Sequence, residues 1–140
     1  MKPVARYTQS KEQQAARELG RAQQAHEAGK EKLEKLLLYR EDYANQFIQA
    51  AAGKGIDGMR AQDYQAFMQN LDKAIVQQKA ANEQLLRDFE MKKRQWLAAR
   101  NRAKAINTVV ENYQQVEQRQ EEKKEQKEQD DRAATAMKKS

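Results

Sequence analysis

The second half of the chain contains neither glycine nor proline: none occurs between Met59 and Ser140. These are the two residues that most often end a helix, so the stretch predicts one uninterrupted helix. The part that precedes it is rich in Ala, Gln, Glu, Lys, Arg and Leu, all of which favour helix. A chain with this pattern folds through long helices rather than through a sheet.

One segment interrupts the helical composition. Three glycines fall within the six residues Gly53-Lys54-Gly55-Ile56-Asp57-Gly58, where they supply conformations suited to a turn, and Asp57 is a candidate N-cap for the following helix. We therefore predict a single coiled-coil domain over residues 1–140. Its expected parts are helix 1 over about 4–52, a turn over 53–59, helix 2 over about 60–130 and a frayed tail over 131–140.

A heptad repeat runs along the second helix, in two rows that alternate by three and four residues and so face one partner helix. The rows are Tyr64, Leu71, Gln78, Leu85, Lys92, Ala99, Ile106 and Tyr113, and Met68, Ile75, Asn82, Phe89, Trp96, Ala103 and Val110. The first helix continues the alternation less regularly, with Leu37 and Ile48 beside it, through Leu19, Ala22, His26, Gly29, Leu33, Leu36, Arg40, Tyr43, Phe47 and Ala50. The pattern predicts an all-α fold, a long two-helix antiparallel coiled coil.

The composition agrees with a thin apolar seam. Of the 140 residues 34% are charged, 6% are aromatic, and the mean hydropathy is −1.17. Bulky apolar residues are too sparse to build a compact globular core. No apolar run approaches the roughly 20 residues that span a bilayer, and Met1-Lys2-Pro3-Val4 does not begin a signal peptide. We expect a cytoplasmic protein. The absence of cysteine excludes disulfides and thiolate chemistry.

The two helices are expected to be unequal. A short connection makes them antiparallel, and a turn centred near residue 56 places Tyr43 near Asn70 and Leu71. The same register leaves everything beyond about Val110 without a partner in the chain, which predicts a charged C-terminal helical overhang. We expect this overhang to be frayed alone and ordered when another molecule surrounds it.

The sequence argues against an enzyme. His26 is the only histidine, so no histidine-based metal cluster or catalytic dyad can form, and His26 itself fits the seam. The carboxylates lie on solvated helical faces, without a cavity to desolvate them. Gly53-Lys54-Gly55 lacks the rest of a phosphate-binding loop and fits a plain turn. We expect no catalytic residue, no metal, no cofactor and no small-molecule ligand.

The basic excess lies in the stretch Lys79–Lys104, which carries eight basic and three acidic residues. Clustered lysine and arginine can neutralise nucleic-acid phosphates. These residues wrap around the helix, however, and Trp96 falls on the seam rather than beside them. A solvated face or a surface for an acidic protein is favoured over nucleic acid. Membrane adsorption is weaker still, because the partner helix already covers the apolar face.

Aromatic and aliphatic residues cluster on both sides of the turn. Tyr43, Phe47, Tyr64 and Leu71 belong to the seam, whereas Tyr39 and Phe67 lie beside it, where a core does not require them. Exposed aromatics on a coiled coil are candidates for a hot spot that binds another protein. The alternative, a seam that is wider near the turn, is equally supported by the sequence.

The residues around the turn resemble those of the flagellar FliJ family. The resemblance rests on Tyr39-Arg-Glu-Asp-Tyr43, on the glycine turn ending in Gly55-Ile56, and on Asp63-Tyr64-Gln-Ala-Phe67-Met-Gln-Asn-Leu71-Asp-Lys-Ala74-Ile75. The core of the match spans roughly residues 32–78. The spacing of the aromatic residues is its specific part.

The resemblance implies a non-enzymatic stalk and adaptor of the flagellar type III protein export apparatus. The terminal end of such a protein enters the hexameric ring of the export ATPase, a FliI-like protein. Its turn-proximal part binds the FlhA-like export gate protein at the inner membrane, which gives a cytoplasmic protein peripheral membrane association. Family members also assist export chaperone cycling. The gate-binding patch maps onto Leu36, Tyr39, Tyr43, Phe67, Leu71 and Ala74, with Lys32 and Gln78 at edges that depart from the family pattern.

Two other hypotheses remain open at the level of the sequence. One is a basic coiled coil that binds nucleic acid or an acidic scaffold protein through residues such as Lys92, Lys93 and Arg94. The other is homodimerisation through the unpaired seam of the long helix. The stalk hypothesis is the one favoured by the turn-proximal residues.

Overall fold

A computed structural model describes residues 2–139 of the chain. It contains two helices, α1 (Lys2–Gly53) and α2 (Gly58–Lys139), and no strand within the described residues. The prediction of an all-α fold built from two long helices packed on each other is confirmed.

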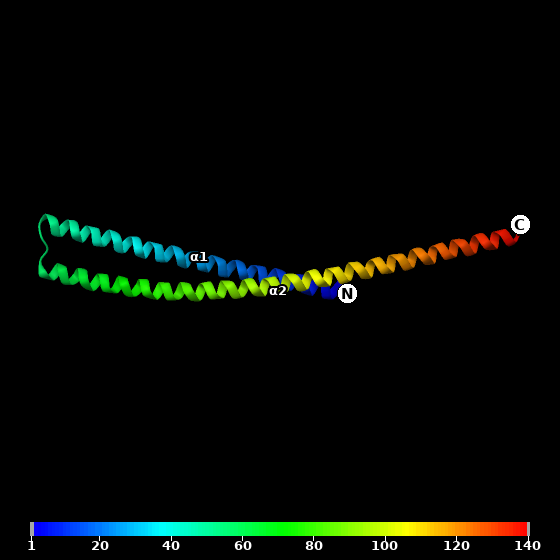
Figure 1. Cartoon of the computed structure of the whole chain (residues 1–140), viewed down its shortest axis with the longest axis horizontal. Helices are drawn as coiled ribbons and strands as arrows, with labels where there is room; N and C mark the ends of the chain where they lie inside the picture. Colours follow the sequence, from blue (N-terminus) through cyan, green and yellow to red (C-terminus); the bar gives the residue numbers. More distant parts are fainter. Residues whose placement is uncertain (1, 140) are drawn as a thin grey trace. The chain divides into compact units, whose positions relative to one another are not determined.

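The chain divides into two compact units. One unit is a hairpin, residues Ala15–Trp96, which contains the turn. The other combines the described residues 2–14 of α1 with residues 97–139 of α2. In Figure 1 the cyan and green parts of the ribbon, which belong to the hairpin unit, run side by side in opposite directions from the turn.

Both helices are longer than predicted. α1 extends to Gly53 and α2 begins at Gly58, so the turn is shorter than the expected 53–59. α2 also continues through the segment 131–139, which was expected to fray. Alanine is abundant there and has the highest helix propensity, and no breaker precedes the end. Residue 140 lies outside the described residues.

Local interactions explain the turn. Gly55 has a φ of 76°, which only glycine adopts without strain. Asp57 caps α2 as predicted: its Oδ1 accepts a hydrogen bond from the backbone N–H of Arg60 at 2.8 Å. The backbone N–H of Ala61 donates to the Asp57 carbonyl at 3.1 Å, closing the first turn of the helix. The glycine-rich segment thus ends one helix and starts the next within a few residues.

The heptad prediction is confirmed in the hairpin unit. Ala22 of α1 and Met68, Leu71 and Ile75 of α2 are its buried apolar residues. Every other α2 seam residue from Tyr64 to Trp96 is half-buried, as are most of the α1 seam residues, whereas Ala50 and the neighbouring Leu37 and Ile48 are exposed. A single apolar seam with solvated outer faces therefore holds the two helices together.

The register differs from the expected one by a few residues. Tyr43 packs on Tyr64 and Phe67 rather than near Asn70 and Leu71. The physical reason is the short turn, because the helices pivot about residues 54–57 and Tyr43 meets residues closer to the turn. Farther out the pairing is close to the expected one, since Arg40 bonds to Asp72 and His26 stacks on Phe89.

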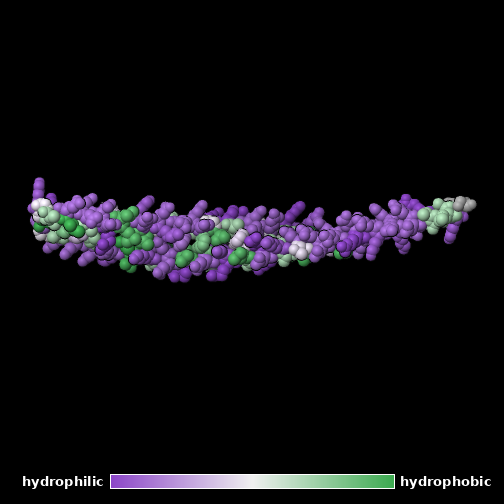
Figure 2. Space-filling model, turned by 45° about the horizontal axis from the view of Figure 1, so that its top comes forward, coloured by the Kyte–Doolittle hydropathy of each residue, from purple (hydrophilic) through white to green (hydrophobic). Residues whose placement is uncertain are grey.

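The second unit has a thinner core. Thr8 is buried, with its hydroxyl donating to the Ala5 carbonyl at 3.0 Å. On α2 the half-buried seam residues end at Val110, and residues 111–138 are all exposed. Tyr113, expected in the seam, is 54% exposed. Figure 2 shows this C-terminal part of α2 as almost entirely hydrophilic up to its more apolar end. The exposed overhang thus begins where the register predicted.

Candidate protein-binding site

Five aromatic residues meet next to the turn of the hairpin. Phe47 stacks on Tyr64 with ring centroids 3.7 Å apart, and Tyr43 stacks on Tyr64 at 5.7 Å. Phe67 joins the cluster through Tyr43, at 4.3 Å, and touches Tyr39 edge-on at 5.9 Å. Such offset and edge-to-face pairs each contribute about 1 kcal/mol beyond the area that they bury. The ring contacts of the cluster all run between α1 and α2, so they hold the two helices together.

Sequence position explains why Tyr39 and Phe67 meet. Tyr39 directly precedes Arg40, and Phe67 directly precedes Met68. Arg40 and Met68 hold the same heptad position in their helices, and the residues before that position face each other along one flank of an antiparallel pair. Two further residues occupy equivalent positions on this flank, Lys32 on α1 and Ala74 on α2. We call these four residues, Lys32, Tyr39, Phe67 and Ala74, the aromatic flank.

The predicted patch residues divide by their exposure. Leu71 is only 8% exposed, so it supports its neighbours from the core and offers almost no surface of its own. Tyr39 is 54% exposed and Lys32 is exposed. The remaining predicted residues are half-buried: Leu36, Tyr43, Phe67, Ala74 and Gln78.

The two hypotheses for the aromatic residues, a widened seam and an exposed binding site, therefore apply to different residues. Phe67 lies between Tyr39 and Tyr43 and is half-buried, as a widened seam requires. Tyr39 makes one ring contact with Phe67 and keeps half of its surface in solvent. Phe67 holds the ring of Tyr39 from one side, and the other side is open to another molecule.

The opposite flank of the hairpin is charged. Arg40 Nε donates a hydrogen bond to Asp72 Oδ1 at 2.6 Å, and both side chains are largely exposed. This hydrogen bond and the charge of the carboxylate raise the pKa of Arg40 above its ordinary value. The hairpin thus has aromatic residues on one side and an ion pair on the other, at about the same distance from the turn.

Sequence reasoning missed two exposed aliphatic residues near this site, Leu38 and Val76. Leu38 is 54% exposed and Val76 is 66% exposed. Neither occupies a position of the aromatic flank: Leu38 lies opposite the seam, and Val76 follows a seam residue rather than preceding one. The heptad position would have marked both as outward-facing apolar residues.

The basic stretch is partly used within the hairpin. Lys92 is a half-buried seam residue, and its Nζ lies 3.6 Å from Glu18 Oε2. Lys93 and Arg94 are exposed, and because neighbouring residues of a helix do not face the same side, the three side chains point in different directions. The three charges that the nucleic-acid hypothesis needs therefore do not share one surface.

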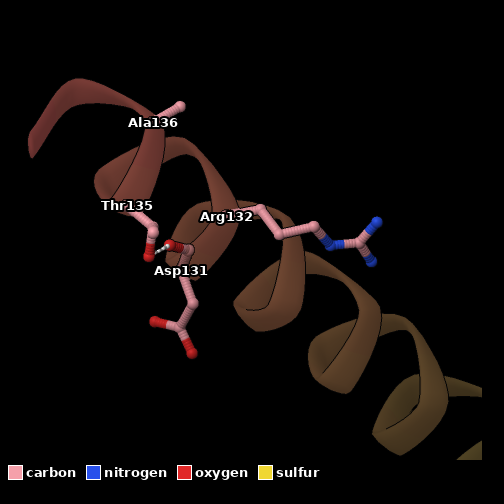
Figure 3. A pocket seen from close by; sticks show the side chains of 4 residues that line it. All are labelled: Asp131, Arg132, Thr135 and Ala136. Atoms are coloured by element: carbon pink, nitrogen blue, oxygen red, sulfur yellow. Dashed lines mark hydrogen bonds between the residues drawn. The ribbon is translucent and has the colours of Figure 1, made fainter. Parts of the chain in front are cut away.

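Open depressions mark the surface of the described residues, one beside the aromatic cluster and others along α2. No group of three or more His, Cys, Asp or Glu among them is placed to hold a metal ion. His26 stacks on Phe89 in the seam, with ring centroids 6.1 Å apart. A shallow depression on α2 is lined by Asp131, Arg132, Thr135 and Ala136, all from one helix (Figure 3). Its one internal bond runs from the Thr135 hydroxyl to the Asp131 carbonyl at 2.9 Å, as in an ordinary helix.

The second unit exposes several large apolar side chains near the chain ends. Val4 and Tyr7 project from α1, and Val109, Tyr113 and Val116 follow one face of α2. Lys11 Nζ lies 5.5 Å from the centre of the Tyr7 ring. Neither helix contains, within the described residues, a stretch long and apolar enough to cross a membrane.

Comparison with known families identifies the family of the chain. The whole chain, residues 1–140, matches the family model described as flagellar FliJ protein. No curated protein and no solved structure matches the chain. The match covers the hairpin with its aromatic residues as well as both chain ends.

Proposed function

The chain belongs to the FliJ family of flagellar proteins, and from this we propose that it is the stalk and adaptor between the export ATPase and the export gate. The family is a non-catalytic component of flagellar protein export. In the proposed role the terminal end of the protein enters the ring of a FliI-like ATPase, and the turn-proximal end binds a FlhA-like gate protein. Assistance to export chaperones and peripheral association with the inner membrane belong to the same proposal.

The pairing of Tyr39 with Phe67 carries the gate-binding half of the proposal. A half-exposed tyrosine supported by a second ring is a typical hot-spot anchor, because its bulk is ordered before binding and it has a free apolar face. The flank also offers Ala74, which is small enough to let a partner approach closely. Leu36, Tyr43 and Leu71 support these residues from the seam.

The exposed part of the second unit supports the ATPase-binding half. Residues 111–138 of α2 are helical and exposed, and Tyr113 and Val116 add exposed apolar side chains near the start of this part. A ring that surrounds this unit can contact side chains on every face of the helix. This arrangement needs no pocket and no catalytic group.

Substitution of Tyr39 tests the gate-binding half directly. Tyr39→Ala is expected to abolish capture of the purified gate protein, because it removes the ordered ring, while far-UV circular dichroism stays unchanged. Leu38→Ala is the matched control: Leu38 is equally exposed, at 54%, but lies off the aromatic flank. Unchanged capture by Tyr39→Ala, or equal loss by both variants, would remove the flank from the proposal.

Truncation tests the ATPase-binding half. A variant ending at Tyr113 is expected to lose stimulation of the export ATPase and to keep binding the gate protein. The hairpin should retain its thermal midpoint, because residues 15–96 form a unit without the removed part. If the truncated protein stimulates the ATPase as the full chain does, the exposed end of α2 has no part in the ring contact.

A further inference from the structure

A layer of polar residues crosses the seam of the hairpin between Gly29 and Asn82. The Asn82 side-chain amide donates from Nδ2 to the Gly29 carbonyl at 3.0 Å. Its Oδ1 accepts a hydrogen bond from Gln78 Nε2 at 2.8 Å. Both ends of the Asn82 amide are thus used, which fixes its orientation. Gly29 is buried and Asn82 is half-buried, so these bonds replace contacts with solvent.

Asn82 requires a glycine at position 29. A Cβ added to Gly29 would overlap Asn82 Oδ1 and lie 3.0 Å from Leu85 Cδ1. The other glycine inside α1, Gly20, has nothing within 4 Å of the equivalent point. Glycine lowers helix stability relative to alanine, and at position 29 this loss is offset by the close approach of the Asn82 amide.

The layer distinguishes the observed pairing from its nearest alternatives. Seam residues repeat every seven positions, so sliding one helix past the other by one heptad sets apolar rows against apolar rows again. After such a slip, Asn82 would face Ala22 or Leu36 in place of Gly29, and its amide would lose the backbone acceptor. Gly29 would then face Ile75 or Phe89, leaving a gap beside a bulky side chain. A buried amide without a partner is unfavourable, because it loses its hydrogen bonds to water and gains none in the protein.

We propose that Asn82 and Gly29 form a register lock, which selects one pairing of the two helices from a set spaced by seven residues. Polar seam residues have this role in coiled coils generally, where they lower stability relative to leucine and define the alignment. The lock is a positioning device for the aromatic flank. A slip of one heptad would pair Phe67 with Lys32 or Gln46 instead of Tyr39. This last consequence rests on the proposed function of the flank; the lock itself does not.

Cross-linking tests the register independently of any partner protein. The chain has no cysteine, so paired cysteines can be introduced and joined with a short bismaleimide. Arg40→Cys with Asp72→Cys reports the native register, since these side chains touch. Arg40→Cys with Gln65→Cys, or with Lys79→Cys, reports a slip of one heptad in either direction, a displacement of about 10 Å along the helix.

With Asn82 present, only the native pair is expected to cross-link within one chain. Asn82→Leu should raise the yield of at least one slipped pair by about fivefold or more, the population ratio that corresponds to about 1 kcal/mol, while helicity and thermal midpoint stay equal or rise. A merely stabilising role predicts a lower midpoint with the register intact. Asn70→Leu is the matched control, because Asn70 is exposed on the same helix.

A second variant keeps the test decisive if Asn82→Leu fails to fold. Asn82→Ala removes the amide without adding bulk beside Gly29 and should give the same increase in slipped pairs. Slipped pairs that stay at background in a folded Asn82 variant would overturn the lock. Increased slipping with undiminished gate capture would leave the lock standing and count against the aromatic flank instead, so the two proposals fail separately.

Discussion

The hairpin unit contains two segments of the same fold with opposite chemistry. The aromatic segment, residues 36–47 with 64–75, joins its helices through ring contacts over a buried core of Met68, Leu71 and Ile75. The polar segment, residues 18–29 with 78–92, joins them through the Asn82 amide, a Glu18–Lys92 ion pair and the His26–Phe89 stack. One segment holds the helices together, and the other determines how they align.

Apolar contacts and hydrogen bonds differ in how strongly they depend on orientation. Apolar contacts depend on buried area and hardly on orientation, so an aromatic core tolerates small displacements. Hydrogen bonds require defined distances and angles, so a displaced amide loses its partner entirely. A seam of leucine alone would bind more tightly with less discrimination. We infer that the directional contacts of the polar segment contribute mainly to the alignment of the two helices.

The largest effect on stability is expected in the aromatic segment. Phe67→Ala removes the ring that contacts both Tyr39 and Tyr43, and for a half-buried phenylalanine we expect a loss of about 2 kcal/mol. Tyr39→Ala, at the exposed end of the same pair, should lose less than half of that. Thermal denaturation followed at 222 nm measures both. Equal losses of stability would mean that Tyr39 is part of the core, as Phe67 is, and not an exposed binding residue.

Two glycine substitutions probe the polar segment next. Gly20→Ala is expected to raise stability by about 1 kcal/mol, since alanine favours helix and the site is open. Gly29→Ala should lower it by about 1–2 kcal/mol, because the new methyl group overlaps Asn82 and strains the packing.

Urea denaturation of these variants provides its own control through a double substitution. Gly29→Ala combined with Asn82→Ala removes the overlap and should recover most of the loss. If Gly29→Ala instead stabilises the protein as much as Gly20→Ala does, the close approach at position 29 is not needed.

Ion pairs offer a smaller contrast between the segments. Lys92 has a side chain only 27% exposed, so Glu18→Gln leaves a poorly solvated charge and should lower stability by about 0.5–1 kcal/mol. Asp72→Asn breaks the more exposed pair with Arg40 and should have a smaller effect that vanishes in high salt. Melting curves at low and at 1 M salt compare them, and a reversed order would place the greater electrostatic constraint in the aromatic segment.

No effect at all is expected when the basic residues of the polar segment are tested for DNA binding. The full chain should leave a labelled duplex unshifted at low salt, and neutralising Lys92, Lys93 and Arg94 should change nothing, because these charges point in different directions. Salt-sensitive binding that disappears in the neutralised variant would favour the nucleic-acid hypothesis over the stalk.

Much of this contrast could be predicted from the sequence, and the reasons for the remainder are specific. The heptad rows followed from the spacing of residues such as Met68 and Ile75, because burial on one helical face imposes that period. The close approach of Gly29 to Asn82 could not be predicted, since it depends on how closely the two backbones pack at that layer. The sequence placed Gly29 only as one member of the less regular seam row of the first helix.

The candidate site shows the same division. Its members could be proposed from a family resemblance, and the seam position of Leu71 already indicated that it would be buried. The unequal exposure of Tyr39 and Phe67 was not predictable, because it depends on which ring lies between the helices. The seam pattern does not describe Leu38 and Val76, because both occupy outward heptad positions.

The short turn at residues 54–57 has a consequence for the order in which the hairpin closes. Phe47 and Tyr64 are separated by few residues along the chain, whereas Glu18 and Lys92 are far apart, so the loop entropy opposing each contact increases with distance from the turn. We expect the helices to zip from the turn, with the aromatic segment structured in the transition state and the Gly29–Asn82 pair formed after it. A chain that starts zipping in the wrong alignment therefore fails to form first the Arg40–Asp72 bond and then the Gly29–Asn82 bond while much of α1 is still unpaired, when reopening is fast and little has to be undone.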